Sequence, residues 1–293
     1  MTRVLLAGGA GFIGRRVALR LLALGVTPVV LDLPASLAKA PPPPGCAMTA
    51  GDVGDAEGLA AAARGCAGIV NLAGVMTLDC ARDPDRALRL NVQGGLNALE
   101  AARRAGVPIA YLSSAGVFGP EDATHPQPMT VYGVTKLAVE GLARVYAADH
   151  GVPSLGLRPY IVYGPGESSG IAAGPSIAIA AALRREPATI RFSGRVGFVH
   201  VDDVARLLAA AVTRPIAGAT TLTLAGDTRE MTEFVAELAR RTGWTGVRVE
   251  GPPLRIPADL ASDPVPAALG AHPATSLEAG IAASLAELAP LAR

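Results

Sequence analysis

Residues 3–20 read RVLLAGGAGFIGRRVALR, and this stretch decides the fold. A short apolar run at 4–7 is typical of a buried parallel strand, and the glycine-dense turn at 8–14 leads into apolar residues at helical spacing. Gly8 would allow a sharp turn, Gly11 would admit a pyrophosphate close to the backbone, and Gly14 would let the helix pack on the strand. The stretch therefore predicts a dinucleotide site, although glycine-rich turns without a ligand are also common.

The second predicted strand ends in a carboxylate that suits this interpretation. Residues 28–33 read PVVLDL, which places Asp32 where the adenosine ribose hydroxyls of a dinucleotide would be bound. No basic residue follows until Lys39, so nothing is placed to neutralise a 2′-phosphate. The sequence favours NAD over NADP.

Composition excludes several classes of protein. The chain has 293 residues, half of them hydrophobic, and a formal net charge of +1, which argues against disorder and against nucleic-acid binding. Apolar runs such as 204–212 are too short to span a bilayer, and the chain enters a strand too early for a secretory signal. Cys46, Cys66 and Cys80 have no metal-like spacing and suit a reducing compartment. We expect a cytoplasmic protein with neither a membrane nor a nucleic-acid partner.

Strands and helices alternate along the first half of the chain. This order predicts an α/β fold with a Rossmann-type doubly wound parallel sheet and a smaller C-terminal α/β substrate lobe. We expect an NAD-binding domain at 1–165, joined by returning segments near 196–225, and a substrate-binding lobe at 166–293. Long helices are predicted at 84–105, broken at Gly94 and Gly95, at 130–150, and at 200–212, capped by Asp202 or Asp203. Strands are predicted at 4–7, 28–33, 48–53, 68–72, 108–114 and 154–163.

Polar or glycine-rich groups follow five of these strands. They are the 8–14 turn, Asp32, Asp52, Ala73 with Gly74, and Ser113 with Ser114. Because ligands of parallel sheets bind beyond the carboxyl ends of the strands, we expect these groups to border one site.

Tyr132 and Lys136 stand at i and i+4, on one face of a predicted helix. A lysine there can lower the pKa of the tyrosine and bind ribose hydroxyls, while the tyrosine exchanges a proton with a substrate oxygen. Lys39 and Lys136 are the two lysines of the chain, so a chance pair is improbable, although an incidental surface pair is the alternative. Ser114, at the end of a strand, would bond the same oxygen or simply cap the chain.

The sequence resembles the extended short-chain dehydrogenase/reductase family, which includes the NAD-dependent epimerases and dehydratases. The matching segments are GGAGFIG, GDV, NLAG, NVQG, LSSAGVFG, YGVTK, LRPYIVYGPG and HVDDVA. The resemblance implies a catalytic acid/base at Tyr132, with Lys136 as its partner and Ser114 as the group that binds the substrate oxygen. It implies a homodimer through the 84–105 and 132–150 helices. Beyond the glycines, Asp32, Tyr132 and Lys136, the implied NAD-binding residues are Phe12, Ile13, Asp52, Val53, Leu72, Ala73, Gly74, Asn91, Pro159 and Val162; the implied substrate residues are Thr77, Ser114, Tyr160 and Arg195.

Departures from the family pattern narrow the function. The acidic pair of the sugar-nucleotide dehydratases is replaced by Ala115 and Gly116, and the amide of the sugar-nucleotide epimerases by Ile161. Val196 stands where those epimerases carry an arginine, with Arg195 one position away. We therefore expect hydride transfer between NAD and a secondary alcohol or ketone of a small polar substrate, such as a sugar, sugar acid or hydroxy acid. A (nucleotide-)sugar epimerase is the alternative.

Other motifs offer competing functions. The segment 166–170, GESSG, fits a hydrolase nucleophile at Ser168, with His272 later in the chain, but it would leave the glycine turn and the Tyr–Lys pair unexplained. His200 with Asp202 and Asp203 suggests a metal, but adjacent polar residues at a helix start are more often a cap, and we predict no metal. A dinucleotide sensor without turnover is a third class, disfavoured by Ser114, Tyr132 and Lys136 together.

Overall fold

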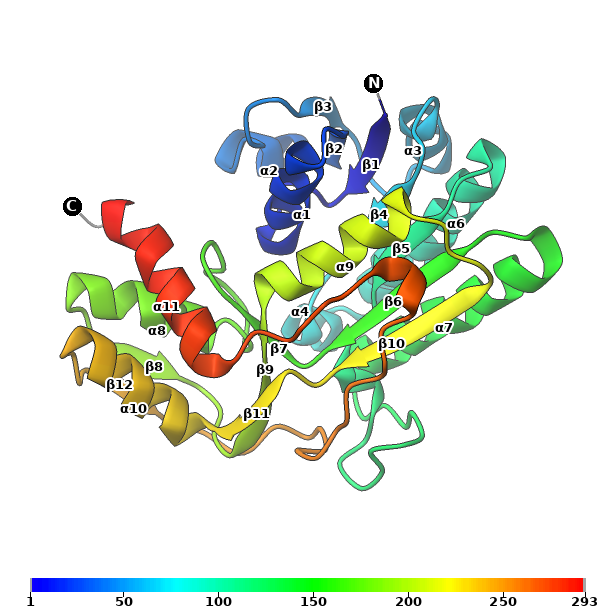
Figure 1. The fold of residues 1–293 in the computed structure, drawn as a ribbon. Coiled ribbons are helices and arrows are strands. Elements are labelled where there is room, and N and C mark those ends of the chain that lie inside the picture. Colours follow the sequence, from blue (N-terminus) through cyan, green and yellow to red (C-terminus); the bar gives the residue numbers. More distant parts are fainter. Residues whose placement is uncertain (1, 292–293) are drawn as a thin grey trace.

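Seven parallel strands form the central sheet of the computed structural model, which describes residues 2–291 (Figure 1). Their order is β10-β6-β5-β4-β1-β2-β3, and every neighbouring pair is parallel. This arrangement confirms the predicted Rossmann-type sheet. The strands are β1 (Arg3–Ala7), β2 (Thr27–Asp32), β3 (Ala47–Ala50), β4 (Ile69–Asn71), β5 (Ile109–Leu112), β6 (Ser154–Pro159) and β10 (Ala219–Leu224).

Helices cover both faces of the sheet, and β1 shows why. Its side chains alternate, so that Val4 and Leu6 pack into one core while Leu5 and Ala7 pack into another. The first core includes α1 (Phe12–Ala23) and α9 (Val201–Thr213), which lie side by side. The second includes α3 (Ala56–Ala63), α6 (Gly94–Ala105) and α7 (Val131–His150). The short α2 (Pro34–Lys39) follows β2.

The predicted strand at 154–163 is two strands. After β6 the chain bends at Tyr160, and β7 (Ile161–Tyr163) leaves the main sheet to pair with β9 (Arg195–His200). The backbones cross very closely there, because a Cβ on Gly197 would lie only 1.7 Å from the Ala225 carbonyl oxygen. Glycine at 197 therefore permits the change of sheet.

The predicted break at Gly94 and Gly95 is also wrong. The segment runs through α5 (Pro84–Ala87), a π-helix η1 (Leu88–Gln93) and α6 without interruption. The two glycines serve packing, since a Cβ on Gly94 would come within 2.8 Å of Val53, and one on Gly95 within 2.8 Å of Val139. The irregularity lies one turn earlier, in the π-helix that carries Asn91.

A smaller lobe follows β7 and lies beside the carboxyl ends of the sheet (Figure 1). Phe198 and Phe234 of this lobe stack with ring centroids 5.4 Å apart, and they are continuous with the core that includes α1 and α9. The helix predicted at 200–212 begins at Val201, and its cap is His200 rather than either aspartate. Among residues 2–291, no helix combines the length and apolar character needed to cross a membrane. The remaining elements are α4 (Thr77–Arg82), α8 (Gly174–Arg184), β8 (Ala188–Ile190), β11 (Asp227–Glu230), α10 (Met231–Thr242), β12 (Val247–Val249) and α11 (Leu277–Leu288), with short 3₁₀ turns η2 (Ala115–Val117), η3 (Ala267–Leu269) and η4 (Ala289–Leu291).

Candidate active site

The glycine turn connects β1 to the start of α1. Gly8 has a φ of +76°, its N–H donates to the Leu31 carbonyl (2.9 Å), and a Cβ there would lie 2.6 Å from the Ala73 nitrogen. Gly11 is the N-cap of α1, and a Cβ there would meet only the Gly8 carbonyl, at 3.4 Å, so space is open in front of it. Phe12, Ile13 and Gly14 form the first turn. The N–H groups at this helix start are suited to an anionic pyrophosphate.

Asp32 ends β2 beside this turn. Its Oδ2 accepts a hydrogen bond from the Ala10 N–H (3.1 Å) and its Oδ1 accepts one from the Leu33 N–H (2.8 Å). A carboxylate accepts about four hydrogen bonds, so capacity remains for ribose hydroxyls. Asp52, exposed after β3, accepts from the Gly54 N–H (2.8 Å), and the buried Val53 follows it.

Asn91 lies behind the end of β4 with its amide fully engaged. Its Nδ2 donates to the Val75 carbonyl (3.1 Å) and to Thr135 Oγ1 (3.0 Å), and its Oδ1 accepts from the Val75 N–H (2.8 Å). A Cβ on Gly74 would lie 2.7 Å from Asn91 Oδ1. Asn91 thus shapes the wall that Leu72, Ala73 and Gly74 form along the predicted dinucleotide site.

Ser114 and Tyr132 meet at the carboxyl end of β5. Thr130 caps α7 by accepting from the Gly133 N–H (3.0 Å), which starts the helix just before Tyr132. Ser114 Oγ accepts from the Gly116 N–H (3.0 Å) and lies close enough to the Tyr132 phenol to lower its pKa. The structure therefore brings the two predicted hydroxyl groups together.

Lys136 lies one turn further along α7. Its ammonium donates to the Leu112 carbonyl (2.9 Å) and lies 5.5 Å from the centroid of the Tyr132 ring. Burial lowers the pKa of Lys136 to about 8 and raises the pKa of Tyr132 to about 12, with the nearby Ser114 hydroxyl opposing the rise. Desolvation dominates the pKa of Tyr132 in the protein alone, so a lowering of that pKa by Lys136 stays a prediction.

A second layer of polar groups, which sequence reasoning missed, supports the site. Arg158 of β6 forms a two-bond ion pair with Glu140 of α7 (2.8 and 2.5 Å), and the Ser113 hydroxyl donates to the same carboxylate. Glu140 follows Tyr132 and Lys136 at the same four-residue interval, and that spacing was the available signal. The fully buried Cys80 lies on the other side, with its thiol 3.3 Å from the Val75 carbonyl.

The residues predicted to bind substrate are dispersed around this corner. Thr77 begins α4 and is half-buried, and the Tyr160 hydroxyl donates to the Ile256 carbonyl (3.2 Å). Arg195 is exposed at the start of β9. Two residues predicted to bind NAD rather than substrate lie nearby in the chain: Pro159 ends β6 and Val162 lies in β7, and both are buried.

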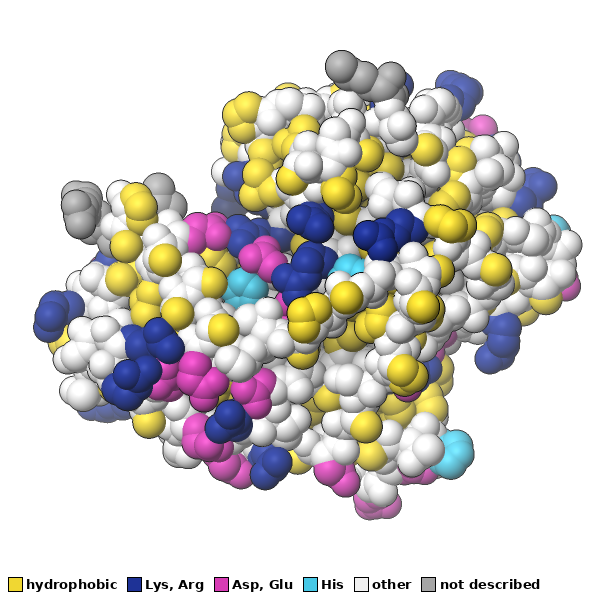
Figure 2. All heavy atoms as spheres, viewed as in Figure 1, with side chains coloured by type: hydrophobic (Ala, Val, Ile, Leu, Met, Phe, Trp, Pro, Cys, Tyr) yellow, Lys and Arg dark blue, Asp and Glu magenta, His cyan; other side chains and the backbone are white. Residues whose placement is uncertain are grey.

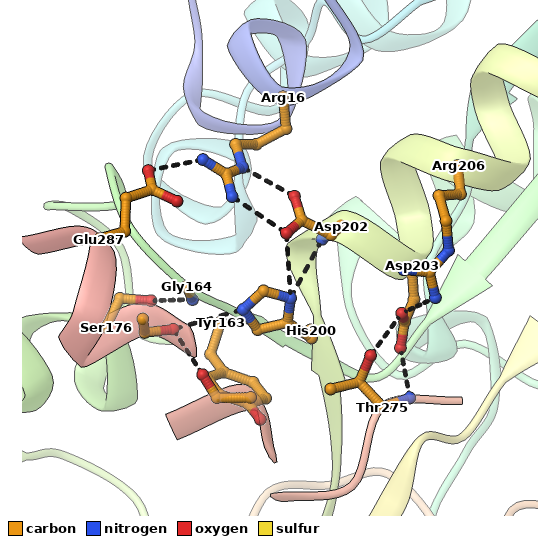
Figure 3. A network of polar contacts seen from close by, with 12 residues as sticks. Arg16, Tyr163, Gly164, Ser176, His200, Asp202, Asp203, Arg206, Thr275 and Glu287 are labelled. Carbon is orange, nitrogen blue, oxygen red and sulfur yellow. Dashed lines mark hydrogen bonds and ion pairs between the residues drawn. The ribbon is translucent and has the colours of Figure 1, made fainter. Parts of the chain in front are cut away.

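The competing motifs lie elsewhere. Ser168 is exposed in the loop before α8, whereas His272 bonds through Nε2 to the Leu269 carbonyl (2.7 Å). Asp202 forms a two-bond ion pair with Arg16 (2.9 and 3.0 Å), and Asp203 accepts from Thr275 (Figure 3). Within residues 2–291, no group of three or more His, Cys, Asp or Glu side chains is placed to hold a metal.

Comparison with known proteins identifies the family. A model described as the NAD dependent epimerase/dehydratase family matches residues 4–224. The chain belongs to this family. This membership confirms three predictions, namely the family resemblance, the assignment as an NAD-dependent enzyme, and NAD as the cofactor of the family. The open cradle before Gly11 and the free capacity of Asp32 fit that cofactor.

The proteins similar to this chain include both epimerases and reductases. The chain is 27% identical over 219 residues to an uncharacterized UDP-glucose epimerase, YtcB, of Bacillus subtilis, covering 69% of this chain and 67% of that one. It is 28% identical over 230 residues to dihydroflavonol 4-reductase of Hordeum vulgare, covering 69% and 64%. The chain therefore spans about two thirds of the length of these relatives. Among solved structures, the UDP-glucose 4-epimerase of Thermus thermophilus in complex with NAD is 28% identical, with a TM-score of 0.79 over 97% of this chain and 98% of that one.

Proposed function

We propose that the protein is an NAD-dependent oxidoreductase that transfers hydride between NAD and a secondary alcohol or ketone of a small polar substrate. The observation that carries the proposal is the convergence of Ser114, Tyr132 and Lys136 at the carboxyl edge of the sheet. The glycine turn and Asp32 border the same edge. A proton-transfer group and a dinucleotide cradle therefore share one face of the fold.

The chain's own groups have separable roles in this proposal. Bound NAD supplies the hydride acceptor or, when reduced, the donor. Ser114 holds the substrate oxygen, and Tyr132 gives a proton to it or takes one from it. Because the pKa of Tyr132 is about 12, the phenol is protonated at neutral pH and suited to protonating a carbonyl oxygen. Lys136, beside the phenol, would stabilise the phenolate that remains.

Two buried side chains argue against a nucleotide-sugar substrate. Ile161 and Val196, at the positions where the sugar-nucleotide epimerases carry an amide and an arginine, are 4% and 0% exposed. Neither can bind a diphosphate. Arg195 is the exposed cation that we assign to an anionic group of the substrate, as in a sugar acid or hydroxy acid.

A sugar epimerase is the second candidate, supported by the similarity to the two UDP-glucose epimerases. An epimerase returns the same hydride within one turnover and must keep its cofactor. The same three residues would serve it, so retention of NAD separates the two candidates.

We also propose a homodimer through α7 and the segment from α5 to α6. Leu88, Val134 and Val145 lie on this segment and on α7 with about half of each side chain exposed. Burial of these side chains against a second copy would remove apolar surface from water. Light scattering coupled to size exclusion tests the proposal, since a monomeric mass would contradict it.

The enzymatic proposal is tested by screening secondary alcohols and ketones, with NADH absorbance as the readout. Sugars, sugar acids and hydroxy acids form the panel, and each active compound is repeated with Tyr132→Phe. Activity that disappears in this variant supports the proposal, whereas equal activity in both proteins contradicts it.

A further inference from the structure

A cavity lies at the amino ends of the central strands, on the opposite side of the sheet from the candidate active site. It has a volume of about 590 Å³ and opens beside Thr2, Ala67 and Pro108, which precede β1, β4 and β5. Its walls come from the C-terminal halves of α1 and α9. A cavity of this size matches those that hold small organic ligands.

Positive charge dominates the lining of this cavity. Arg20 of α1, Arg206 of α9 and Arg214 at the end of α9 all line it, and no carboxylate does. Arg206 is partly neutralised by Asp203, and Arg214 donates one hydrogen bond to the Leu269 carbonyl (2.8 Å). Within residues 2–291, the Arg20 guanidinium has neither an ion pair nor a hydrogen bond. Figure 2 shows dark-blue side chains gathered around a cyan one over α1 and α9, in the middle of that face.

His272 adds an unpartnered polar atom to the lining. Its Nε2 bonds to the Leu269 carbonyl, and its buried Nδ1 has no partner in the described part of the chain. Leu24, Val26 and Val212 supply an apolar wall beside these polar groups.

We propose that this cavity binds a small organic anion, a phosphate ester or carboxylate with a compact apolar group. Guanidinium groups recognise both oxyanions through paired hydrogen bonds, and the aliphatic wall accommodates a hydrocarbon or ring. The site is distinct from the dinucleotide site, because the two lie at opposite ends of the strands.

The position of the cavity suggests what occupancy does. Helix α1 begins at the glycine turn and ends at the cavity, and it packs along α9. A ligand that bridges Arg20 and Arg214 joins the far ends of these two helices. Binding therefore stabilises the folded protein by mass action without displacing NAD.

Isothermal titration at low salt with phenyl phosphate, benzoate, inorganic phosphate and phenol tests the site. Saturable one-site binding of phenyl phosphate or benzoate, unchanged by excess NAD, supports the proposal, and the tighter of the two identifies the anionic group. Absence of saturation with both, or competition with NAD, would overturn it. If inorganic phosphate bound as tightly as phenyl phosphate, the proposed contribution of the aliphatic wall to binding would be refuted.

Matched variants locate the binding. Arg214→Ala is expected to weaken binding at least tenfold, whereas Arg89→Ala, at an exposed arginine of η1, is expected to change it less than twofold. Should Arg214→Ala fail to fold, Arg214→Lys keeps the charge but removes the planar guanidinium that forms paired hydrogen bonds. That variant is expected to weaken binding severalfold. Equal losses in the Arg214 and Arg89 variants would show general surface charge and refute the site.

Discussion

Two polar clusters near the carboxyl ends of the strands differ in whether their buried cation has a carboxylate partner. In the candidate active site, made of Ser114, Tyr132 and Lys136, the ammonium has a carbonyl and an aromatic ring as neighbours. In the α1–α9–α11 network, made of Arg16, His200, Asp202 and Glu287, the arginine is paired with two carboxylates (Figure 3). The first cluster carries a desolvated charge, and the second a compensated one.

This difference indicates that the first cluster has a functional role and that the second stabilises the fold. A lysine whose pKa falls to about 8 is held in an unfavourable state, which is the arrangement expected at a functional site. The network instead joins α11 and α9 to α1, the helix that follows the glycine turn. Damage to the first cluster should therefore remove activity, and damage to the second should reduce stability.

The largest expected effect is that of Tyr132→Phe. Turnover should fall by about 10²–10⁴-fold because the proton-transfer group is lost, while NAD affinity stays within a few-fold. Steady-state kinetics on an active compound from the screen, with NAD titration, measures both. Tyr146→Phe, on the same helix with its hydroxyl toward Glu100, is the control. Unchanged turnover would remove Tyr132 from the mechanism.

Asp202→Asn tests the network. Arg16, whose side chain is 12% exposed, loses the charge of Asp202 and one of its two bonds to that side chain but keeps Glu287, and the free energy of unfolding should fall by about 1–2 kcal/mol. Urea denaturation measures this change. Asp79→Asn is the matched control, because its pair with Arg82 is long (3.6 Å) and exposed, and about 0.5 kcal/mol or less is expected. Equal losses of unfolding free energy in the two variants would contradict a stabilising role for the Arg16–Asp202 pair.

Lys136→Met tests the uncompensated charge. The folded pKa lies below the ordinary value of 10.5, so the protonated lysine opposes folding at neutral pH, and this cost is relieved between about pH 8 and 10.5. The variant should be more stable by about 1–2 kcal/mol at pH 7, a figure discounted for partial exposure, and inactive. Denaturation at pH 7 and pH 10 measures the gain, which should shrink at the higher pH. A loss of stability at pH 7 would contradict the assignment.

Asp32→Ala sharpens the cofactor assignment. NAD binding should weaken about tenfold and NADP binding much less, since the carboxylate is placed for unphosphorylated ribose hydroxyls. Fluorescence titration with both cofactors measures the ratio. Equal weakening would mean that Asp32 acts through its bond to the Ala10 N–H, holding the turn rather than the ribose.

The smallest effect is expected at Arg195. Arg195→Ala should raise KM for an anionic substrate a few-fold and leave kcat unchanged, because the exposed side chain contributes binding alone. The neutral analogue of that substrate provides the control. An unchanged KM would make Arg195 an ordinary surface residue.

Local patterns were sufficient for the sheet and for the grouping of Ser114, Tyr132 and Lys136 at one end of it. The glycine turn, the strand ends and the Tyr132–Lys136 spacing depend on residues close in sequence, where strand and helix periods apply. The crossing at Gly197, the π-helix around Asn91 and the Arg16–Asp202 pair depend on contacts between distant segments. The strand β9 was not predicted because residues 196–200 are all buried, so no alternation of polar and apolar residues marks it as a strand.

Native mass spectrometry of the purified protein, followed by titration with NAD and NADP, tests the central claim most directly. A dehydrogenase that exchanges its cofactor in each turnover should bind NAD reversibly and in preference to NADP. NAD that stays bound through purification would instead support the sugar epimerase as the function of this protein. Absence of dinucleotide binding at any concentration would contradict the account, because the turn at residues 8–14 would then have no ligand.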